Sequence, residues 1–203
     1  KSVAATKTYT TSLLAIAMLS ASLSESEEMW SDLEKIPQAV SAALTLDQMA
    51  KEAATRWRFS DRCVVIGRGF NYASAFEMAL KLKELTYIIA EPYSPADLLH
   101  GPFAIVEKDF PVLIIAPHGA MLPNINQLLI NLHNAGADTL IISDDEETLK
   151  VGDAQLRLPF RVPEWLSPIT AIIAGQLFAM RLTEIKKLDI DNPRGLNKVT
   201  RTQ

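Results

Sequence analysis

Cysteine is scarce in this sequence, and its scarcity limits the chemistry that the chain can perform. Only Cys63 is present among the 203 residues, so no disulfide joins two parts of the chain. The residues that follow it, Val64, Val65 and Ile66, are apolar, which favours a buried structural thiol over a reactive one. The absence of a disulfide framework fits a reducing compartment, and we expect a cytoplasmic protein.

Basic charge and histidine are also in short supply. The formal net charge of -4 argues against the broad basic surface with which nonspecific nucleic-acid binders displace counterions. The 3 histidines, His100, His118 and His133, lie far apart at irregular spacing, which is not the pattern of a zinc site. We therefore expect no nucleic-acid partner, no metal and no cofactor, and we interpret His118 and His133 as structural residues.

The sequence lacks an uninterrupted apolar segment of membrane-spanning length near its start. The apolar stretch at residues 13–23 is shorter than the roughly 20 residues that cross a bilayer, and nearby Thr and Ser residues favour a helix of the protein core. No membrane span is predicted. The sequence opens on Lys1 and not on methionine, so we expect it to be a piece of a longer protein.

Short apolar runs alternate with helical patterns over most of the chain. Helices are predicted at residues 6–23, 28–41 and 45–56, with a capping opportunity at residues 24–27 and Thr45 as the cap of the third helix. No strand is predicted before residue 62. Strands are then predicted at residues 63–66, 112–116, 139–143 and 155–158, separated by helices at residues 72–89, 122–135 and 165–188. This order predicts an α/β fold with a mainly parallel sheet between two layers of helices.

A glycine pair follows the first predicted strand. Gly67 and Gly69 in that position invite comparison with a dinucleotide-binding turn, in which backbone approaches a pyrophosphate. Tyr72 stands where that fingerprint requires its third glycine, and no acidic residue ends a second strand to hold a ribose. A tight turn from strand to helix explains both glycines, so no nicotinamide or flavin is expected.

Two charged residues of the following helix lie three positions apart. Lys81 and Glu84 therefore share one helix face, whereas Lys83 points elsewhere. Such a pair is most often an exposed ion pair of little energetic value, and that interpretation is favoured for the pair taken alone. The alternative is a carboxylate and an amine in a catalytic site.

Two further candidates lie on predicted turns. Ser94 can cap a single helical turn that Gly101 and Pro102 end, which would hold His100 at its end, in either a structural or a catalytic role. In the tail, Pro193 and Gly195 fix a turn that could deliver Lys198 into a pocket; the alternative is a disordered end. A carboxylate, an imidazole and amines around one site suit proton transfer between adjacent carbons of a carbonyl compound.

Five motifs in one order carry a resemblance to a known family. They are residues 2–7 (SVAATK) with Thr10, the pattern G-R-G-x-x-Y-x-x-A-x-E-x-A-L-K-L-K-E at residues 67–84, Glu91, His100-Gly101-Pro102, and D-x-P-R-x-L-x-K at residues 191–198. On these motifs the chain resembles the second half of a double sugar-isomerase (SIS) domain protein. The family includes glucosamine-6-phosphate deaminases and the isomerase module of glutamine:fructose-6-phosphate amidotransferase.

The resemblance implies catalytic roles for four residues. Glu84 matches the base that moves a proton between C1 and C2 of the sugar, and Lys81 matches a supporting lysine beside it. His100 matches the histidine of ring opening, which in relatives reaches the site of a neighbouring subunit. Lys198 matches the lysine that contacts the sugar and takes part in ring opening or Schiff-base chemistry.

The resemblance also implies the substrate pocket and the domain order. The backbones of Val3 and Asn197 would line the sugar pocket. Residues 1–58 would be a helical linker from a missing first SIS half, residues 59–188 the SIS domain, and residues 189–203 a tail that closes the sugar site. The phosphate-binding Ser/Thr loops belong to the missing half, so the expected partners are a sugar phosphate, that half and a second copy in a homodimer.

The expected function is that of an isomerase or deaminase of an amino-hexose 6-phosphate, of the type that converts glucosamine 6-phosphate to fructose 6-phosphate. Ala5, where the synthase usually has serine, and the ending at residues 198–203 favour a deaminase over the synthase. Three alternatives stay open: the isomerase module of the amidotransferase, a sensor that binds a sugar phosphate without turning it over, and a structural or dimerisation half.

Overall fold

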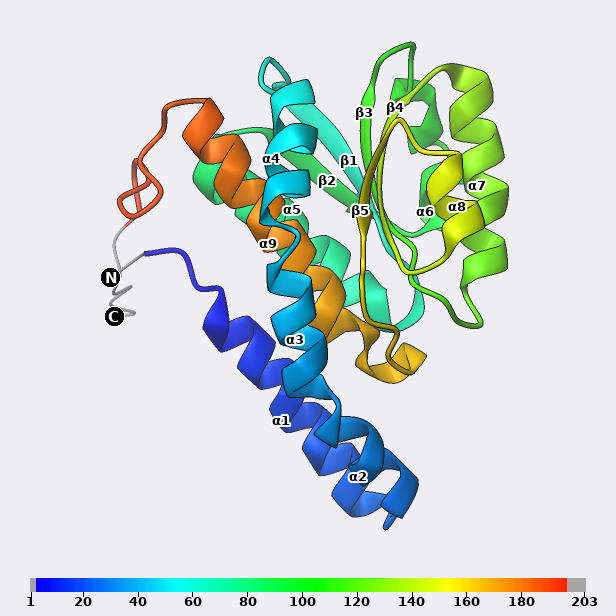
Figure 1. The fold of residues 1–203 in the computed structure, drawn as a ribbon. Coiled ribbons are helices and arrows are strands. Elements are labelled where there is room, and N and C mark those ends of the chain that lie inside the picture. The colour runs from blue at the N-terminus through cyan, green and yellow to red at the C-terminus, as the bar shows by residue number, and fades with distance from the viewer. Residues whose placement is uncertain (1–2, 197–203) are drawn as a thin grey trace, which may run out of the picture.

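A five-stranded parallel sheet forms the centre of the fold in the computed structural model, which describes residues 3–196 (Figure 1). The strands lie in the order β2-β1-β3-β4-β5, and every neighbouring pair is parallel. Their bounds are β1 Arg62–Ile66, β2 Ile89–Tyr93, β3 Pro111–Ile115, β4 Asp138–Ser143 and β5 Ala154–Arg157. The predicted α/β class with a mainly parallel sheet is confirmed.

Helices cover both faces of this sheet. On one face pack α4 (Asp47–Arg56), α5 (Tyr72–Thr86) and α9 (Ser167–Ile185); on the other lie α6 (Pro95–Leu99), α7 (Leu122–Ala135) and α8 (Glu146–Lys150). The first helices, α1 (Lys7–Leu23), α2 (Glu27–Glu34) and α3 (Ile36–Leu44), extend past the end of the sheet (Figure 1). Three short 3₁₀ turns complete the described elements: η1 (Gly69–Asn71), η2 (Pro102–Ile105) and η3 (Glu164–Leu166).

Alternate residues of each central strand face the two helical layers. In β1, Cys63 and Val65 pack toward α5 and α9, whereas Val64 and Ile66 pack toward α7. Because helices cover both faces, these strands are continuous apolar runs and do not alternate with polar residues. That is why their sequences could be recognised as strands of a parallel sheet.

The strand β2 was not predicted, and the helix predicted at residues 72–89 is too long. The structure ends α5 at Thr86, places Tyr87 in the left-handed region with φ 60°, and begins β2 at Ile89. This edge strand contains Glu91 and Pro92, which weaken a strand pattern. Proline is tolerated at a sheet edge, where one side of the strand needs no partner.

Two details of the opening helices also differ from the prediction. The helix predicted at residues 28–41 is two helices, because the chain turns at Lys35 and α3 restarts with Pro37 in its first turn. Thr45 ends α3 and does not cap α4; its hydroxyl donates to the carbonyl of Ala42. The capping prediction for residues 24–27 is confirmed, since the Ser26 hydroxyl accepts from the amide of Met29.

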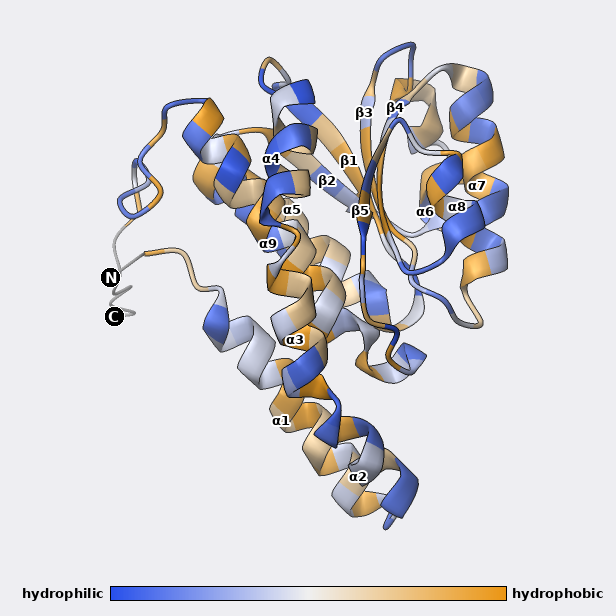
Figure 2. Ribbon diagram, in the orientation of Figure 1, coloured by the Kyte–Doolittle hydropathy of each residue, from blue (hydrophilic) through white to orange (hydrophobic). Residues whose placement is uncertain are grey.

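The apolar stretch at residues 13–23 is not a core helix, contrary to the prediction. Only the small residues Ala17 and Ala21 of α1 are buried, whereas Ile16 is 61% exposed and Leu23 is 77% exposed. The buried side packs on the helices that follow α1 and on the start of α9. No other described element covers the opposite side, where apolar residues remain visible along the helix (Figure 2).

The segment 164–185 is long and apolar enough to cross a membrane, with a mean hydropathy of 1.3. In the structure, however, 78% of its most apolar window is buried inside the protein. Its buried residues, among them Phe178 and Leu182, belong to the core between α9 and the sheet. The segment is therefore a core helix of this fold.

Cys63 is buried, as predicted, and burial raises the pKa of its thiol to about 12. At pH 8 only about 10⁻⁴ of the folded molecules would carry the nucleophilic thiolate, against roughly a quarter for a free cysteine. We therefore expect an alkylating reagent to modify Cys63 at least about a hundredfold more slowly in folded than in urea-unfolded protein. Mass spectrometry over time measures both rates, and equal rates would contradict the buried position.

Candidate functional site

The turn between β1 and α5 sets the position of the candidate site residues. A side chain on Gly67 would place its Cβ 2.2 Å from the carbonyl oxygen of Asn71, so only glycine fits there. Gly69 has φ +59°, in the left-handed region that glycine tolerates best. The Asn71 amide group donates to the Ser167 hydroxyl at 2.8 Å, which ties the turn to the start of α9. The glycine pair thus makes the predicted tight turn into α5.

Three charged side chains lie on one face of α5, at i, i+4 and i+7. Lys81 donates a hydrogen bond to Glu84, and its Nζ lies 3.6 Å from a carboxylate oxygen of Glu77. The side chains of Lys81, Glu77 and Glu84 are only 3%, 11% and 22% exposed. The shared face of Lys81 and Glu84 is confirmed, whereas the interpretation as an exposed ion pair is wrong. A buried ammonium with two carboxylates is uncommon away from functional sites.

A cleft of about 500 Å³ opens beside this triad, which is large enough for a sugar phosphate. One wall is α5, and the other is the start of the chain with the first turns of α1. Val3 lies in this wall; its predicted role in a sugar pocket stays a prediction. The lining residues are Val3, Ala4, Ala5, Thr8, Tyr9, Ser12, Glu77, Leu80, Lys81, Glu84 and Leu196.

The two ends of the described chain meet at the cleft. The amide of Val3 donates to the carbonyl of Asp191 at 3.2 Å. The amide of Arg194 donates to the Tyr87 hydroxyl at 2.8 Å, and the Arg194 guanidinium lies 4.2 Å above the Tyr87 ring. The predicted turn at Pro193 and Gly195 is present, and Leu196 lies in the cleft wall.

Two predicted site residues, Asn197 and Lys198, lie outside the described residues. Leu196, the last residue that the structure describes, lines the cleft. Their roles stay predictions.

His100 does not line this cleft. It ends α6, which the Ser94 side chain caps as predicted by accepting from the amide of Asp97 at 3.2 Å. Leu98 of α6 packs into the core on the α7 side of the sheet, whereas Lys81 and Glu84 belong to α5 on the other side. The imidazole is exposed. Within one chain, His100 and Glu84 are therefore not brought together.

Glu77 was not predicted as a site residue from the sequence, although it lies within the motif at residues 67–84. Burial raises the pKa of its carboxyl group above the ordinary value, and the nearby Lys81 ammonium acts in the opposite direction. Tyr9 was missed as well; burial raises the pKa of its hydroxyl group. The spacing of four residues between Glu77 and Lys81 is the signal that sequence reasoning left unused.

The raised pKa of Glu77 makes a pH-dependent prediction. The folded protein holds this proton more tightly than the unfolded chain, so the stability from this group declines as pH rises through the carboxyl range. Glu77→Gln removes that decline. We expect the unfolding free energy of the variant, relative to wild type, to rise between pH 4 and pH 7. Urea denaturation across this range measures it, and a constant difference between the two proteins would contradict it.

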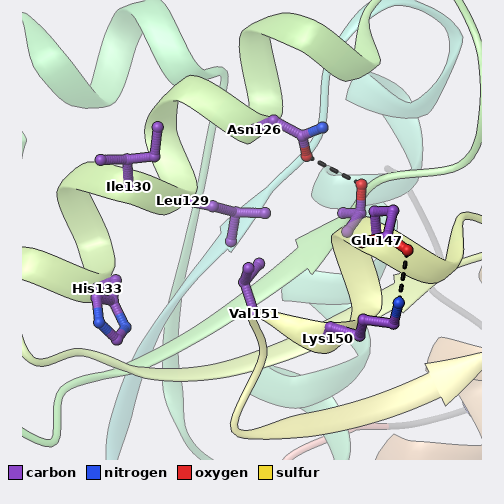
Figure 3. Close-up of a pocket in the computed structure, with 8 residues that line it drawn as sticks. Asn126, Leu129, Ile130, His133, Glu147, Lys150 and Val151 are labelled. Carbon is purple, nitrogen blue, oxygen red and sulfur yellow. Dashed lines mark hydrogen bonds and ion pairs between the residues drawn. The ribbon is translucent and has the colours of Figure 1, made fainter.

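A second cleft, of about 540 Å³, lies between α7 and α8 (Figure 3). Its lining includes the apolar residues Leu129, Ile130 and Val151 together with His133 and an exposed ion pair between Lys150 and Glu147. Of the predicted catalytic residues that the structure describes, Lys81, Glu84 and His100, none lines it. The cleft beside α5 is the better candidate because buried charged side chains, Lys81 and Glu77, line it, whereas the charged side chains at the α7–α8 cleft are exposed.

Metal ligands do not gather at either cleft. Within residues 3–196, no group of three or more His, Cys, Asp or Glu side chains is placed to hold a metal ion. The α5 cleft offers carboxylates and an amine to a bound molecule.

Comparisons with known proteins place this chain in a family. The family model described as "SIS domain" matches residues 58–185. A glutamine--fructose-6-phosphate aminotransferase [isomerizing] of Legionella pneumophila (strain Paris) is 35% identical over 202 residues, which are 97% of this chain and 33% of that protein. The chain thus spans about a third of the length of such relatives.

Solved structures agree. The C-terminal domain of glucosamine-fructose-6-phosphate aminotransferase from Francisella tularensis superposes with a TM-score of 0.86 at 29% identity, over 94% of this chain and 57% of that one. A glucosamine-6-phosphate deaminase from Thermotoga maritima superposes with a TM-score of 0.73 over 98% of this chain and 57% of that one; at 20% identity it shows the fold alone. The chain therefore belongs to the SIS domain family.

Proposed function

We propose that the protein containing this chain interconverts an amino-hexose 6-phosphate and a ketose 6-phosphate, of the glucosamine 6-phosphate and fructose 6-phosphate type. The observation that carries the proposal is the buried triad of Lys81, Glu77 and Glu84 in the wall of a sugar-sized cleft. Relatives with 35% identity whose names include fructose 6-phosphate support the choice of substrate class. Their length supports a preceding segment that completes the site.

The proposed reaction begins with a proton transfer between C1 and C2 of the open-chain amino sugar, which gives an imine at C2; water then hydrolyses the imine to the ketose and ammonia, and the reverse sequence consumes ammonia and releases water. Glu84 is the more exposed of the two carboxylates, so it is the one that reaches a bound sugar and takes the proton. Lys81 stays between the carboxylates, where its ammonium balances their charge and holds Glu84 in place. Glu77 is a positioning residue in this scheme, because it contacts Lys81 from the more buried side.

Ring opening by His100 requires a second copy of the chain in this proposal. Since His100 lies on the α7 side of the sheet, it serves a site in a neighbouring subunit and not its own. We therefore propose a homodimer in which each copy lends one histidine. Asn197 and Lys198 are proposed to complete the pocket as the tail continues from Leu196. A cytoplasmic location is proposed from the single buried thiol.

A second candidate is the isomerase module of an aminotransferase that takes its nitrogen from glutamine. The curated relatives of 35% identity carry that name, and this favours it. The α5 cleft would perform the same proton transfer in both cases, so the two candidates differ in where the ammonia comes from or goes.

The test follows both products of glucosamine 6-phosphate in the full-length protein, with the 203-residue chain run in parallel. Release of ammonia together with fructose 6-phosphate supports a deaminase. Formation of glucosamine 6-phosphate from fructose 6-phosphate only when glutamine is supplied supports the aminotransferase module. Sugar-phosphate binding without turnover in either direction would overturn the enzymatic proposal in favour of a sensor.

A further inference from the structure

The carboxyl ends of β1, β2 and β3 form a third cleft of about 420 Å³, separate from the α5 site and from the cleft between α7 and α8. Its lining residues are Arg68, Gly69, Tyr72, Ser94, Asp97 and Met121. In the strand order β2-β1-β3, the chain passes from β1 to β2 on one side of β1 and then returns to place β3 on the other side. The order of the strands thus reverses at β1. Open α/β sheets bind ligands in the crevice outside the strand ends at such a reversal.

Backbone amides usually hold the ligand's anionic group at such a crevice, but here the chain's own carboxylates accept from them. The amides of Ala120 and Met121, which precede α7, donate to the Glu164 carboxylate at 2.8 and 3.4 Å. The amide of His118 donates to Asp144 at 2.6 Å. These three amides of the loop after β3 already have acceptors within the protein. A ligand oxyanion would therefore need another hydrogen-bond donor.

Arg68 is that donor. Its Nε atom is buried and has no hydrogen-bond partner within the described residues. A buried donor without an acceptor loses its hydration and gains nothing in return, so a ligand oxyanion that reaches it is bound favourably. Arg68 follows directly on Gly67 at the end of β1, which fixes its backbone at the crevice.

Asp97 supplies the opposite charge in the same cleft. The hydroxyl groups of Ser94 and Tyr72 donate to its carboxylate at 2.7 and 3.2 Å, and these hydrogen bonds hold the pKa of Asp97 below its ordinary value. Asp97 and Arg68 line one cavity without forming an ion pair with each other. A cavity with separated charges of both signs is complementary to a ligand that carries both.

We infer that this crevice binds a small zwitterionic ligand, with an oxyanion on Arg68 and an ammonium group on Asp97. The inference concerns a site distinct from the α5 cleft and does not depend on the proposed reaction. An amino-sugar phosphate has both groups on one small molecule, and glucosamine 6-phosphate is the probe used below. Glucose 6-phosphate is its matched partner, because it has a hydroxyl where the probe has the ammonium.

The methyl group of Met121 provides a local readout, because this side chain lines the crevice. The experiment is an NMR titration of methionine-methyl-labelled full-length protein in phosphate-free buffer, with Met121→Leu to assign the signal. It is done in a Glu84→Gln background, so that turnover does not consume the probe if the proposed reaction is correct. We expect a saturable shift of the Met121 signal with glucosamine 6-phosphate and at least about tenfold weaker binding with glucose 6-phosphate.

Variants separate the crevice from the rest of the molecule. Arg68→Gln should weaken the Met121 response at least about tenfold, and Asp97→Asn should abolish the preference for the ammonium-bearing probe. Arg62→Gln is the matched control, since Arg62 is an exposed arginine at the other end of the same strand. No saturable Met121 shift, or a shift that persists unchanged in Arg68→Gln, would overturn the inference. Neither result would bear on turnover at the α5 cleft.

Discussion

Glu84→Gln is expected to lower turnover of the sugar phosphate by about 10²- to 10⁴-fold while leaving its binding within about threefold of wild type. The amide keeps the shape of the side chain and its contact with Lys81, but it cannot take a proton from carbon. Steady-state kinetics of the full-length protein measure the rate, and calorimetric titration measures binding. Because the loss is confined to the chemical step, turnover falls and affinity does not.

The control for this variant is a glutamate in a similar local pattern at another site. Glu147→Gln in α8 breaks an exposed ion pair with Lys150, also three residues away, and should leave turnover unchanged. Near-normal turnover in Glu84→Gln would move the base to another residue, and Glu77 would then be the first to examine. Equal losses in both variants would indicate damage to the fold and not to the chemistry.

Trp57→Ala is expected to lower the free energy of unfolding by about 3–5 kcal/mol. The Trp57 side chain is 1% exposed, and its ring meets that of Phe178 edge to face with centroids 5.3 Å apart. Truncation would leave a cavity beside Phe178, at the end of α4. Urea denaturation at constant slope measures the loss.

Two substitutions frame that result. Trp57→Phe keeps an aromatic ring and removes the Nε1 hydrogen, which has no partner among the described residues, so it should cost far less. Phe59→Ala, at a ring that is 84% exposed, should change stability by less than about 0.5 kcal/mol. A loss below about 1 kcal/mol in Trp57→Ala would show that α4 lies outside the cooperative unit.

The domain boundary proposed at residue 58 stays a prediction.

The central strands could be predicted from sequence because burial on both faces leaves a local pattern. Residues 63–66 and 112–116 are apolar without interruption, and no other part of the fold was needed to recognise them. The edge strand β2 gave no such pattern, since Glu91 and Pro92 are acceptable only where one side of the strand is unpaired. That position is a property of the sheet and not of the segment.

Burial of the site residues could not be predicted from the same kind of pattern. Lys81 looks like any exposed helix lysine, and it is covered because α1 and the tail converge on α5 from the two ends of the chain. The resemblance predicted Glu84 and Lys81 as site residues, whereas the burial of Glu77 against Lys81 is seen only in the structure. The separation of His100 from Glu84 by the sheet is likewise invisible to sequence spacing.

The hydrogen bond from Val3 to Asp191 has a consequence for how the protein is made. It closes a loop that contains almost the whole chain, so the wall of the α5 cleft is assembled from the first and the last described residues. A ribosome releases the later residues only after the sheet and its helices have emerged and had time to fold. Closing so long a loop adds little free-energy cost beyond a shorter one. The cleft is therefore completed only after residues 191–196 have left the ribosome, and a nascent chain that has not reached them has an unfinished site.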